Sequence, residues 1–294
     1  MHSLRRLVVK THLRRMARQG WPVGAGMAIF LDDFIGEKIL LDGGFDLEEL
    51  GCLERDVLPH VAPGTACLDI GANIGNHARV FARHFDKVYA FEPHPRIFGL
   101  LSANAYGHGI LPLNYGLSNR AGQFAAEENV ANLGASRLVS DTSGNGPKYE
   151  VKRLDDVVGD LVDGEIGFVK IDVEGHETQV IQGGAETFRR HRPIVTFEVL
   201  AETVVRGEPE AVSALRALGY RFFYRMQPRA AWRRMRLSVI SRLLRAVRRL
   251  HSGRSLDQLE MVPFEALGPQ EIYAVLIAST RPLDFTTTER SARG

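Results

Sequence analysis

Residues 66–75 read ACLDIGANIG. The first five residues form a short apolar run that predicts a buried strand, and Gly71 and Gly75 then bracket a turn into a helix expected from about Asn76 to His84. Two glycines let such a turn bend tightly and approach a ligand closely. The following helix N-terminus offers free N–H groups to polar ligand atoms. We therefore expect a ligand site at the carboxyl edge of a parallel sheet.

The same alternation of strand and helix continues along the chain. Short apolar runs, each a candidate strand, recur with helical patterns between them at residues 87–91, 110–117, 168–172, 194–198, 220–224 and 273–278. This alternation is typical of an α/β domain with a mostly parallel sheet and helices on both faces. We place that domain at residues 46–281.

Several segments interrupt the alternation. Residues 119–152 are rich in Gly, Asn and Ser and predict an inserted hairpin or lid. Residues 1–45 are expected to hold a basic N-terminal segment and, from residue 22, a small β-element. Residues 225–270 predict an Arg-rich helical insertion before the last strand, and residues 282–294 predict a flexible tail.

The composition excludes several classes of protein. A chain of 294 residues with 45% hydrophobic and 24% charged residues can build a full core and is neither disordered nor repetitive. It has no run of about 18 uncharged apolar residues and no secretory apolar region at its start. Two cysteines, Cys52 and Cys67, cannot build a disulfide scaffold or a Cys-rich metal site, and Cys67 fits a small core position. We expect a cytoplasmic protein.

The formal net charge of +2 hides an uneven distribution. Segment 1–18 carries six basic residues, segment 225–254 carries ten arginines, and neither contains an acidic residue. The rest of the chain holds 35 acidic and 21 basic residues. An acidic body with two basic segments differs from a uniformly basic nucleic-acid binder.

The Arg-rich segment has the pattern of a basic amphipathic helix. Between Trp232 and Leu250, apolar residues recur at spacings of three and four with arginines on the opposite side. Such a helix could dock on the domain, lie on an anionic membrane surface or bind nucleic acid. Nucleic acid is disfavoured because only Trp232 is available for stacking within the Arg-rich run. A second basic segment at residues 1–18 raises the alternative of a peripheral location at the inner membrane face, since one weak anchor rarely suffices.

The glycine spacing separates classes of nucleotide ligand. A dinucleotide fingerprint needs G-x-G-x-x-G, and a phosphate-binding P-loop needs Gly-Lys-Ser/Thr, whereas residues 71–75 read G-x-x-x-G. The turn therefore suits a ligand without phosphates. Glu92 ends the next strand, 17 residues after Gly75, where an acid can accept hydrogen bonds from both ribose hydroxyls of an adenosine. Together these features indicate S-adenosylmethionine.

A second motif, VKIDVEGHE at residues 169–177, places several reactive side chains close together. Because strand side chains alternate, Asp172 and Glu174 are expected on one face at the carboxyl end of their strand. Glu198 ends the neighbouring strand. These three carboxylates and His176 are therefore expected to converge near the methyl donor.

Methyl transfer to a hydroxyl needs that oxygen to be positioned at the methyl carbon and relieved of its proton. His176 or one of the carboxylates could serve as the base. Alternatively, Asp172, Glu174 and Glu198 could hold a divalent cation that lowers the pKa of the hydroxyl. Both alternatives stay open, as does the reading of these residues as ordinary charges at the end of a strand.

Three motifs resemble the FkbM family of S-adenosylmethionine-dependent methyltransferases: LDIGANIGNH at residues 68–77, FEP at 91–93 and VKIDVEGHE at 169–177. The resemblance covers roughly residues 37–200. It implies a Rossmann-like class I methyltransferase fold with a seven-stranded, mostly parallel sheet. It also implies O-methyl transfer to hydroxyls of sugars, glycolipids or polyketides.

The resemblance also implies roles for individual residues. Asp172 would face the reacting centre, Glu92 would hold the ribose, and the methionine part of the donor would be cradled by Asp69, Gly71, Asn73 and Gly75. The Arg-rich segment is not part of the family pattern. Two other functions remain as alternatives: an RNA-binding or RNA-modifying protein, and a catalytically inactive scaffold that binds the cofactor.

Overall fold

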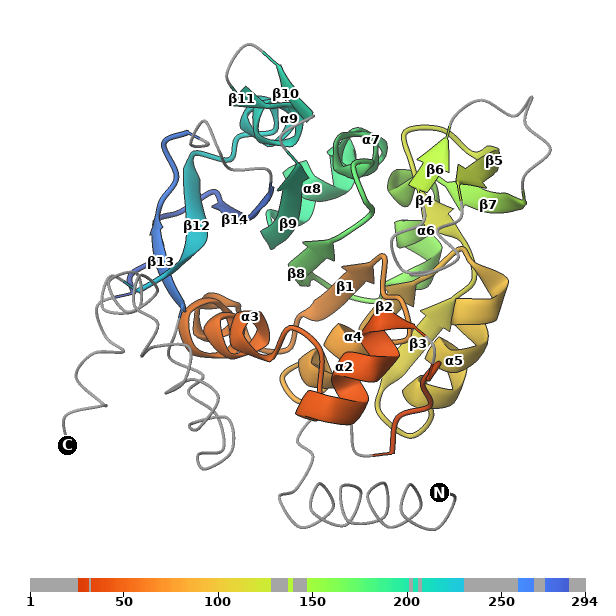
Figure 1. Ribbon diagram of the computed structural model, residues 1–294. Coiled ribbons are helices and arrows are strands. Elements are labelled where there is room, and N and C mark those ends of the chain that lie inside the picture. Colours follow the sequence, from red (N-terminus) through yellow and green to blue (C-terminus); the bar gives the residue numbers. More distant parts are fainter. Residues whose placement is uncertain are drawn as a thin grey trace, which may run out of the picture.

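The computed structural model describes residues 26–31, 33–127, 137–139, 147–200, 203–205, 208–229, 259–266 and 273–285. At its centre lies an eight-stranded sheet with the order β13-β12-β14-β9-β8-β1-β2-β3 (Figure 1). Five parallel strands form one side of the sheet: β1 (Ala66–Ile70), β2 (Val88–Phe91), β3 (Ile110–Leu113), β8 (Ile166–Ile171) and β9 (Ile194–Leu200).

The chain order of these five strands across the sheet is third, second, first, fourth, fifth, as in the Rossmann fold. The order reverses between β1 and β8, which places a ligand crevice outside the carboxyl ends of these two strands. The predicted Rossmann-like fold is thus confirmed, and the glycine turn after β1 lies at the reversal point.

Three further strands complete the sheet. β14 (Tyr273–Ser279) runs antiparallel to both β9 and β12 (Phe222–Pro228). β13 (Leu259–Pro263) pairs antiparallel with the outer edge of β12. The sheet therefore has one strand more than the seven that were expected. The extra strand, β13, comes from the segment 225–270, which was expected to be an Arg-rich helical insertion.

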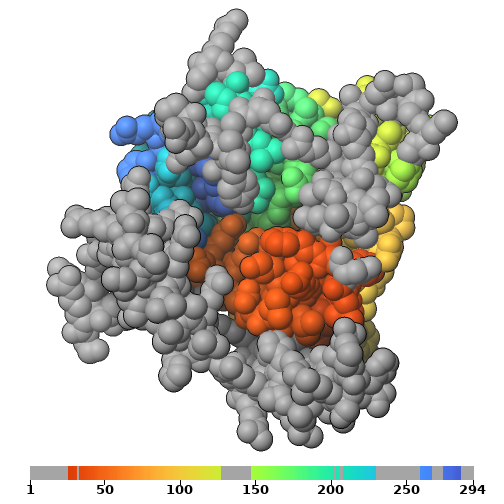
Figure 2. Space-filling view, viewed as in Figure 1, coloured from red at the N-terminus to blue at the C-terminus, as the bar shows by residue number. Residues whose placement is uncertain are grey.

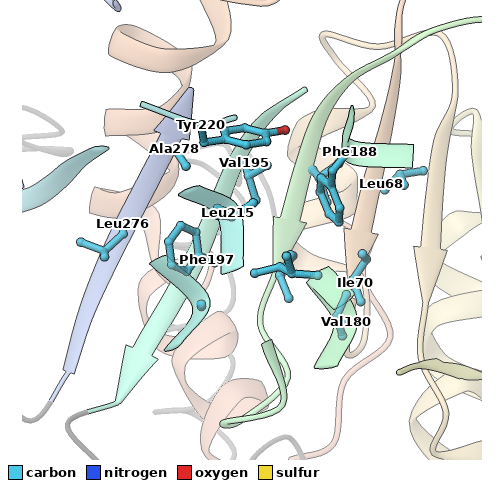
Figure 3. Packing of buried hydrophobic residues seen from close by; sticks show 14 of the residues in the cluster. Leu68, Ile70, Val180, Phe188, Val195, Phe197, Leu215, Tyr220, Leu276 and Ala278 are labelled. Carbon is cyan, nitrogen blue, oxygen red and sulfur yellow. The ribbon is translucent and has the colours of Figure 1, made fainter. Parts of the chain in front are cut away.

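Helices cover both faces of the sheet, because its strands are apolar on both sides. One face packs against α6 (Leu154–Leu161), α7 (Glu177–Gly183), α8 (Ala185–His191) and α9 (Glu210–Ala217). Figure 3 shows part of this core, including Leu68, Ile70, Val180, Phe188 and Phe197.

The other face packs against α3 (Leu47–Cys52), α4 (Asn76–Phe81) and α5 (Pro95–Ala105). α3 continues into a π-helical turn (Leu53–Val57) and a 3₁₀ turn (Leu58–His60). Cys52 and Cys67 are both free and buried in this core, as expected for Cys67.

The predicted insertion contributes most of a separate four-stranded sheet. Its order is β4-β7-β5-β6, with β4 (Gly116–Leu117), β5 (Gly122–Glu127), β6 (Arg137–Val139) and β7 (Lys148–Lys152). β5 pairs antiparallel with both β6 and β7. A short two-stranded ribbon, β10 (Val204–Val205) with β11 (Glu208–Pro209), precedes α9.

The prediction of an N-terminal β-element was wrong, because the described residues there form a helix, α2 (Phe34–Asp42). The Asp33 side chain accepts hydrogen bonds from the N–H groups of Ile35 and Gly36 and so caps the first turn. Gly43, at a φ of 84°, ends the helix by donating its N–H to the Ile39 carbonyl. The apolar residues of α2 pack on Ile74 of the glycine turn.

Several sequence expectations fall outside the described residues. The basic segment 1–18 does, as do residues 230–258 and 267–270 of the expected insertion at residues 225–270. Residues 225–228 belong to β12, so the proposed helical insertion does not begin at residue 225. The first residues of the expected tail pack against the domain. Leu283 is buried, and its N–H donates to the Tyr224 hydroxyl at 2.8 Å. Within the described part, no helix has the length and apolar character needed to cross a bilayer.

Candidate active site

The glycine turn after β1 packs directly against the end of β8. Gly71 has a φ of 77°, and a Cβ atom on it would lie 1.8 Å from the Asp172 carbonyl oxygen. The N–H groups of Gly71 and Ala72 donate to the Phe91 carbonyl at 3.0 Å, and the N–H of Asp172 donates to the Ile70 carbonyl. Only glycine combines this backbone conformation with this close approach. The turn is thus held between the ends of β2 and β8.

Two more residues of the turn have left-handed backbones. Asn73 has a φ of 51°, which asparagine adopts more readily than most residues, and its Oδ1 accepts the N–H of Ile74 at 2.7 Å. Gly75, at 89°, is the N-cap of α4, and a Cβ atom there would lie 2.9 Å from a Leu101 methyl group. The three-residue interval between the glycines therefore matches the geometry of this turn.

Glu92 lies beside the turn, as the sequence predicted. Its Oε2 accepts the N–H of Asn73 at 3.1 Å, and its Oε1 accepts the N–H of His94 at 2.8 Å. The side chain is only 7% exposed, and this burial raises its pKa to about 7 although the two N–H donors oppose the shift. A carboxylate has about four acceptor positions, so two N–H donors leave room for ligand hydroxyls.

Lys170 connects the carboxylates of β1 and β8. Its Nζ lies 3.3 Å from Asp69 Oδ1, 3.1 Å from Asp172 Oδ2 and 3.3 Å from the Gly71 carbonyl oxygen. Burial opposes the charge of Lys170, but Asp172 and Asp69 outweigh burial and raise its pKa. Burial raises the pKa of Asp69, and Lys170 opposes that shift. The buried lysine therefore stays cationic and fixes the Asp172 carboxylate at the sheet edge.

Lys170, Asp172 and the glycine turn border a narrow cavity of about 40 Å³. Its wall consists of the turn, the end of β8 and the N-terminal segment, specifically Ile35, Phe45, Gly71, Ala72, Asn73, Ile74, Asn76, His77, Lys170 and Asp172. A nucleoside-sized ligand needs several hundred Å³, so this cavity must widen to bind one.

His77 is the least satisfied polar side chain in the wall of this cavity. It is 7% exposed, and its Nε2 has no hydrogen-bond partner. Burial lowers the pKa of His77 well below its usual value, with Lys170 adding to the shift, so the ring is neutral. Water or a polar ligand supplies the partner of such a buried polar atom. The cavity therefore fits a polar ligand.

The N-terminal segment adds two carboxylates that the sequence analysis missed. Burial raises the pKa of Asp46 to about 6 and that of Glu49 to about 8, and in both cases nearby Asp172 raises it further. The chain separates Asp46 from Asp172 by 126 residues, and no motif connects them. Only the docking of α2 and α3 over the glycine turn brings them together.

The four catalytic candidates do not all converge. Asp172 lines the cavity, and Glu198 lies on the adjacent strand, close enough to contribute to the pKa of Lys170. Glu174 has a φ of 52° in the turn after β8, where the chain leaves the strand.

His176 was expected at the methyl donor, but the structure places it elsewhere. Its Nε2 lies 2.9 Å from the buried Ser118 hydroxyl, and its ring meets that of Phe124 edge-on at 6.0 Å. Burial lowers the pKa of His176 to about 4, so the ring is neutral near pH 7. It does not line the cavity and instead joins the loop after β8 to the second sheet.

Glu177 holds that loop in place. Its Oε1 accepts the N–H groups of Val173 and Gly175 at 3.3 Å and 3.0 Å, and burial raises its pKa to about 7. The sequence motif contains Glu177, but nothing in its spacing shows that this carboxylate binds its own loop rather than a ligand.

The expected divalent-cation site is not formed by the described residues. Among them, no three His, Cys, Asp or Glu side chains are grouped so that they could hold a metal ion. The set Asp172, Glu174 and Glu198 fails because the turn at Glu174 leaves the direction of the strand.

A larger cavity of about 450 Å³ lies between the second sheet and α6. Its walls are Ala121, Gly122, Gln123, Glu150, Val151, Lys152, Asp156 and Val157. It shares no residue with the cavity at the glycine turn and contains none of the predicted site residues. We therefore place the candidate active site at the smaller cavity.

The burial of Glu92 predicts a specific dependence of stability on pH. Its pKa rises from 4.5 in the unfolded chain to about 7 in the fold, so the folded state binds the extra proton. The stability that this proton provides is lost as the pH rises through about 7. One pKa unit corresponds to ~1.4 kcal/mol. Between pH 4.5 and 7.5 the native chain should therefore lose roughly 3 kcal/mol of unfolding free energy that the Glu92→Gln variant does not lose.

Urea unfolding at a series of pH values measures this difference. Glu186→Gln, a change at an exposed position, is the control and should follow the native chain at every pH. A constant difference between Glu92→Gln and the native chain across the range would contradict the assignment.

Comparisons with known proteins identify the family of this chain. The family model described as "Methyltransferase FkbM domain" matches residues 69–222, which include the glycine turn, Glu92 and the motif after β8. The hexuronic acid methyltransferase AglP of Haloferax volcanii is 36% identical over 122 residues, which is 39% of this chain and 48% of that protein. The chain thus matches about half the length of this relative.

Solved structures show more distant similarity. A methyltransferase FkbM from Methylobacillus flagellatus KT is 15% identical, with a TM-score of 0.35 over 60% of this chain and 46% of that one. The magnesium protoporphyrin IX methyltransferase of Synechocystis PCC 6803, solved with bound S-adenosylmethionine, is 11% identical, with a TM-score of 0.42 over 94% and 96% of the two chains.

Proposed function

The chain belongs to the FkbM methyltransferase family, and on this premise we propose that it transfers a methyl group from S-adenosylmethionine to a hydroxyl group of a sugar. Its fold is the Rossmann-like class I methyltransferase fold, with one additional edge strand. When bound, S-adenosylmethionine supplies an electrophilic methyl group on a positively charged sulfur.

The observation that carries the choice of donor is the contact between Glu92 and the glycine turn. A buried carboxylate at the end of β2 accepts the N–H of Asn73 within the turn. In this proposal Glu92 holds the ribose and the turn around Gly71 and Gly75 cradles the methionine part. Asp69 is fully buried and pairs with Lys170, so it would support the turn rather than touch the donor. The unpartnered His77 Nε2 supports a polar ligand at this position.

The acceptor is proposed from the relative. AglP is named a hexuronic acid methyltransferase, which favours a hydroxyl of a sugar or glycolipid over one of a polyketide. Because the match covers about half of that protein, the uronic acid itself is a proposal for this chain.

Asp172 is the proposed base. Its carboxylate lines the cavity, and Lys170 holds it at 3.1 Å. The acceptor oxygen would attack the methyl carbon as the carbon–sulfur bond breaks, and the hydroxyl proton would pass to Asp172. Glu198 and Glu174 would contribute negative electrostatic potential at the same edge of the sheet. His176 would act as a positioning residue, because it joins the loop after β8 to Ser118. The described residues do not support the alternative of a divalent cation.

The alternatives of RNA modification and of binding to a membrane surface rest on segments 1–18 and 225–254. The described part of these segments is residues 225–229, of which residues 225–228 belong to a strand. No described residue therefore favours either alternative over the methyltransferase, and a cytoplasmic or membrane-peripheral location remains a proposal.

Calorimetric titration tests the donor directly. We expect S-adenosylmethionine to bind and NAD not to bind, because the turn lacks the spacing for a pyrophosphate. Glu92→Gln should weaken binding of S-adenosylmethionine by about 10- to 100-fold, since hydrogen bonds to a charged group contribute ~1.5–3 kcal/mol. The exposed Glu186→Gln variant should bind like the native chain. Binding of NAD, or equal affinity in both variants, would refute the proposed donor site.

A further inference from the structure

The N-terminal segment forms one wall of the candidate donor site, although the family match begins only at residue 69. In Figure 1 α2 lies in front of α4, and Figure 2 shows the outer face of this red-orange segment at the molecular surface. Phe45, in the connection to α3, lines the cavity beside Gly71 and Asp172. The segment is therefore part of the site rather than an appendage.

A buried asparagine fixes this connection. The Asn76 side chain is 3% exposed, accepts the N–H of Phe45 at 3.1 Å and donates to its carbonyl at 2.9 Å. The next residue, Asp46, adopts a left-handed backbone with a φ of 50°. Such a conformation is costly for a residue with a side chain, although less so for aspartate and asparagine. The docking thus fixes the backbone at Asp46.

The resulting cluster has more negative than positive charge. Asp46 and Glu49 both interact electrostatically with Asp172 and Lys170. Asp69 and Asp172 already pair with Lys170, and Lys38, which also lowers the pKa of Asp46, pairs with Asp42. Carboxylates in excess over cations in a partly buried site favour a ligand that brings positive charge.

His77 points independently to a ligand in the same cavity. It lines the cavity together with Lys170 and Asp172, it is more than nine-tenths buried, and its Nε2 has no partner. A ligand that is both polar and cationic satisfies the orphaned nitrogen and the excess carboxylates together.

We propose that Asp46 makes the pocket selective for the positively charged sulfonium donor over its neutral thioether product. The proposal rests on the proposed function, because it takes S-adenosylmethionine as the donor. The donor and S-adenosylhomocysteine differ by one methyl group and one positive charge. Transfer of the methyl group removes that charge, so the carboxylates would bind the donor strongly and the product weakly. Product release would follow from the same electrostatics.

The experiment is a calorimetric titration of the full chain with S-adenosylmethionine and, separately, with S-adenosylhomocysteine. Asp46→Asn keeps the size of the side chain and tolerates the left-handed backbone. It should weaken binding of the donor about 10-fold, equivalent to ~1.4 kcal/mol, and leave the product within about twofold. Glu49→Gln, a second variant with an ordinary helical backbone, should lower the affinity for the donor only above about pH 8, because burial raises the pKa of Glu49 to about 8.

Asp42→Asn is the matched control. Asp42 belongs to the same segment, but its side chain is 46% exposed and pairs with Lys38 at 3.6 Å. It should change neither affinity. Equal loss of donor and product affinity in Asp46→Asn would assign a structural role to Asp46 and overturn the inference. Unchanged affinity for both ligands would also overturn it. If the native chain bound neither ligand, the proposed function would fail first, and the native titration shows that before any variant is compared.

Discussion

Gly71→Ala is expected to abolish binding of the methyl donor and to lower the free energy of unfolding by about 2 to 5 kcal/mol. The backbone at Gly71 has a φ of 77°, and this conformation costs a residue with a side chain ~1–2 kcal/mol. The new Cβ atom would lie 1.8 Å from the Asp172 carbonyl oxygen, and overpacking of this kind costs about 1–3 kcal/mol more. Because the obstacle is backbone, the turn and the end of β8 must separate. Urea unfolding and calorimetric titration measure the two effects.

Gly64→Ala separates conformational strain from the clash. Gly64 has a similar φ of 72°, but nothing lies within 4 Å of the position of its Cβ atom. The Gly64→Ala variant should therefore lose only ~1–2 kcal/mol of unfolding free energy, which is the cost of the backbone strain, and should keep its affinity for the donor. If both variants bound the donor equally well, the packing of the turn against β8 would not matter for the site.

Asp172→Asn is expected to lower the turnover number about 10²- to 10⁴-fold, the range that general-base catalysis contributes. Affinity for the donor should change only severalfold. Lys170 keeps Asp69 as a partner at 3.3 Å, so the substitution does not leave a buried lysine unpaired, and the fold should persist. Transfer of a labelled methyl group from S-adenosylmethionine to glycosides that contain hexuronic acid measures turnover, and calorimetry measures donor affinity.

Asp160→Asn, at an exposed position on α6, serves as the control and should retain full turnover. Undiminished turnover in Asp172→Asn would remove Asp172 as the base and leave Glu198 as the next carboxylate at that edge. Donor binding without turnover on any sugar in the native chain would instead support the inactive scaffold.

The central part of the fold could be predicted because its signals are local. Each buried strand is a short apolar run, and the glycines at residues 71 and 75 mark the turn at the carboxyl edge. Carboxyl ends of parallel strands meet at one edge, so Glu92 and Asp172 could be placed near that turn without coordinates. The structure puts Glu92 on the turn and Asp172 in the wall of the cavity.

Local signals also misled in two places. The apolar run in residues 34–42 is too short to distinguish a strand from a helix, and the cap residues Asp33 and Gly43 decided for the helix. Asp172 and Glu174 were placed by extending strand alternation past Ile171, where β8 ends, and His176 was expected beside them. The left-handed backbone at Glu174 breaks that alternation and turns His176 toward Ser118.

By itself, the sequence determined the parallel sheet, the glycine turn and the acid that follows the second strand, since hydrophobic periodicity and backbone freedom act over a few residues. The tertiary structure alone decided that Asp46 and Glu49 lie within electrostatic reach of Asp172, and that His77 is buried without a partner. Burial and Coulomb interactions depend on distance in space, and here they join segments more than a hundred residues apart in the chain.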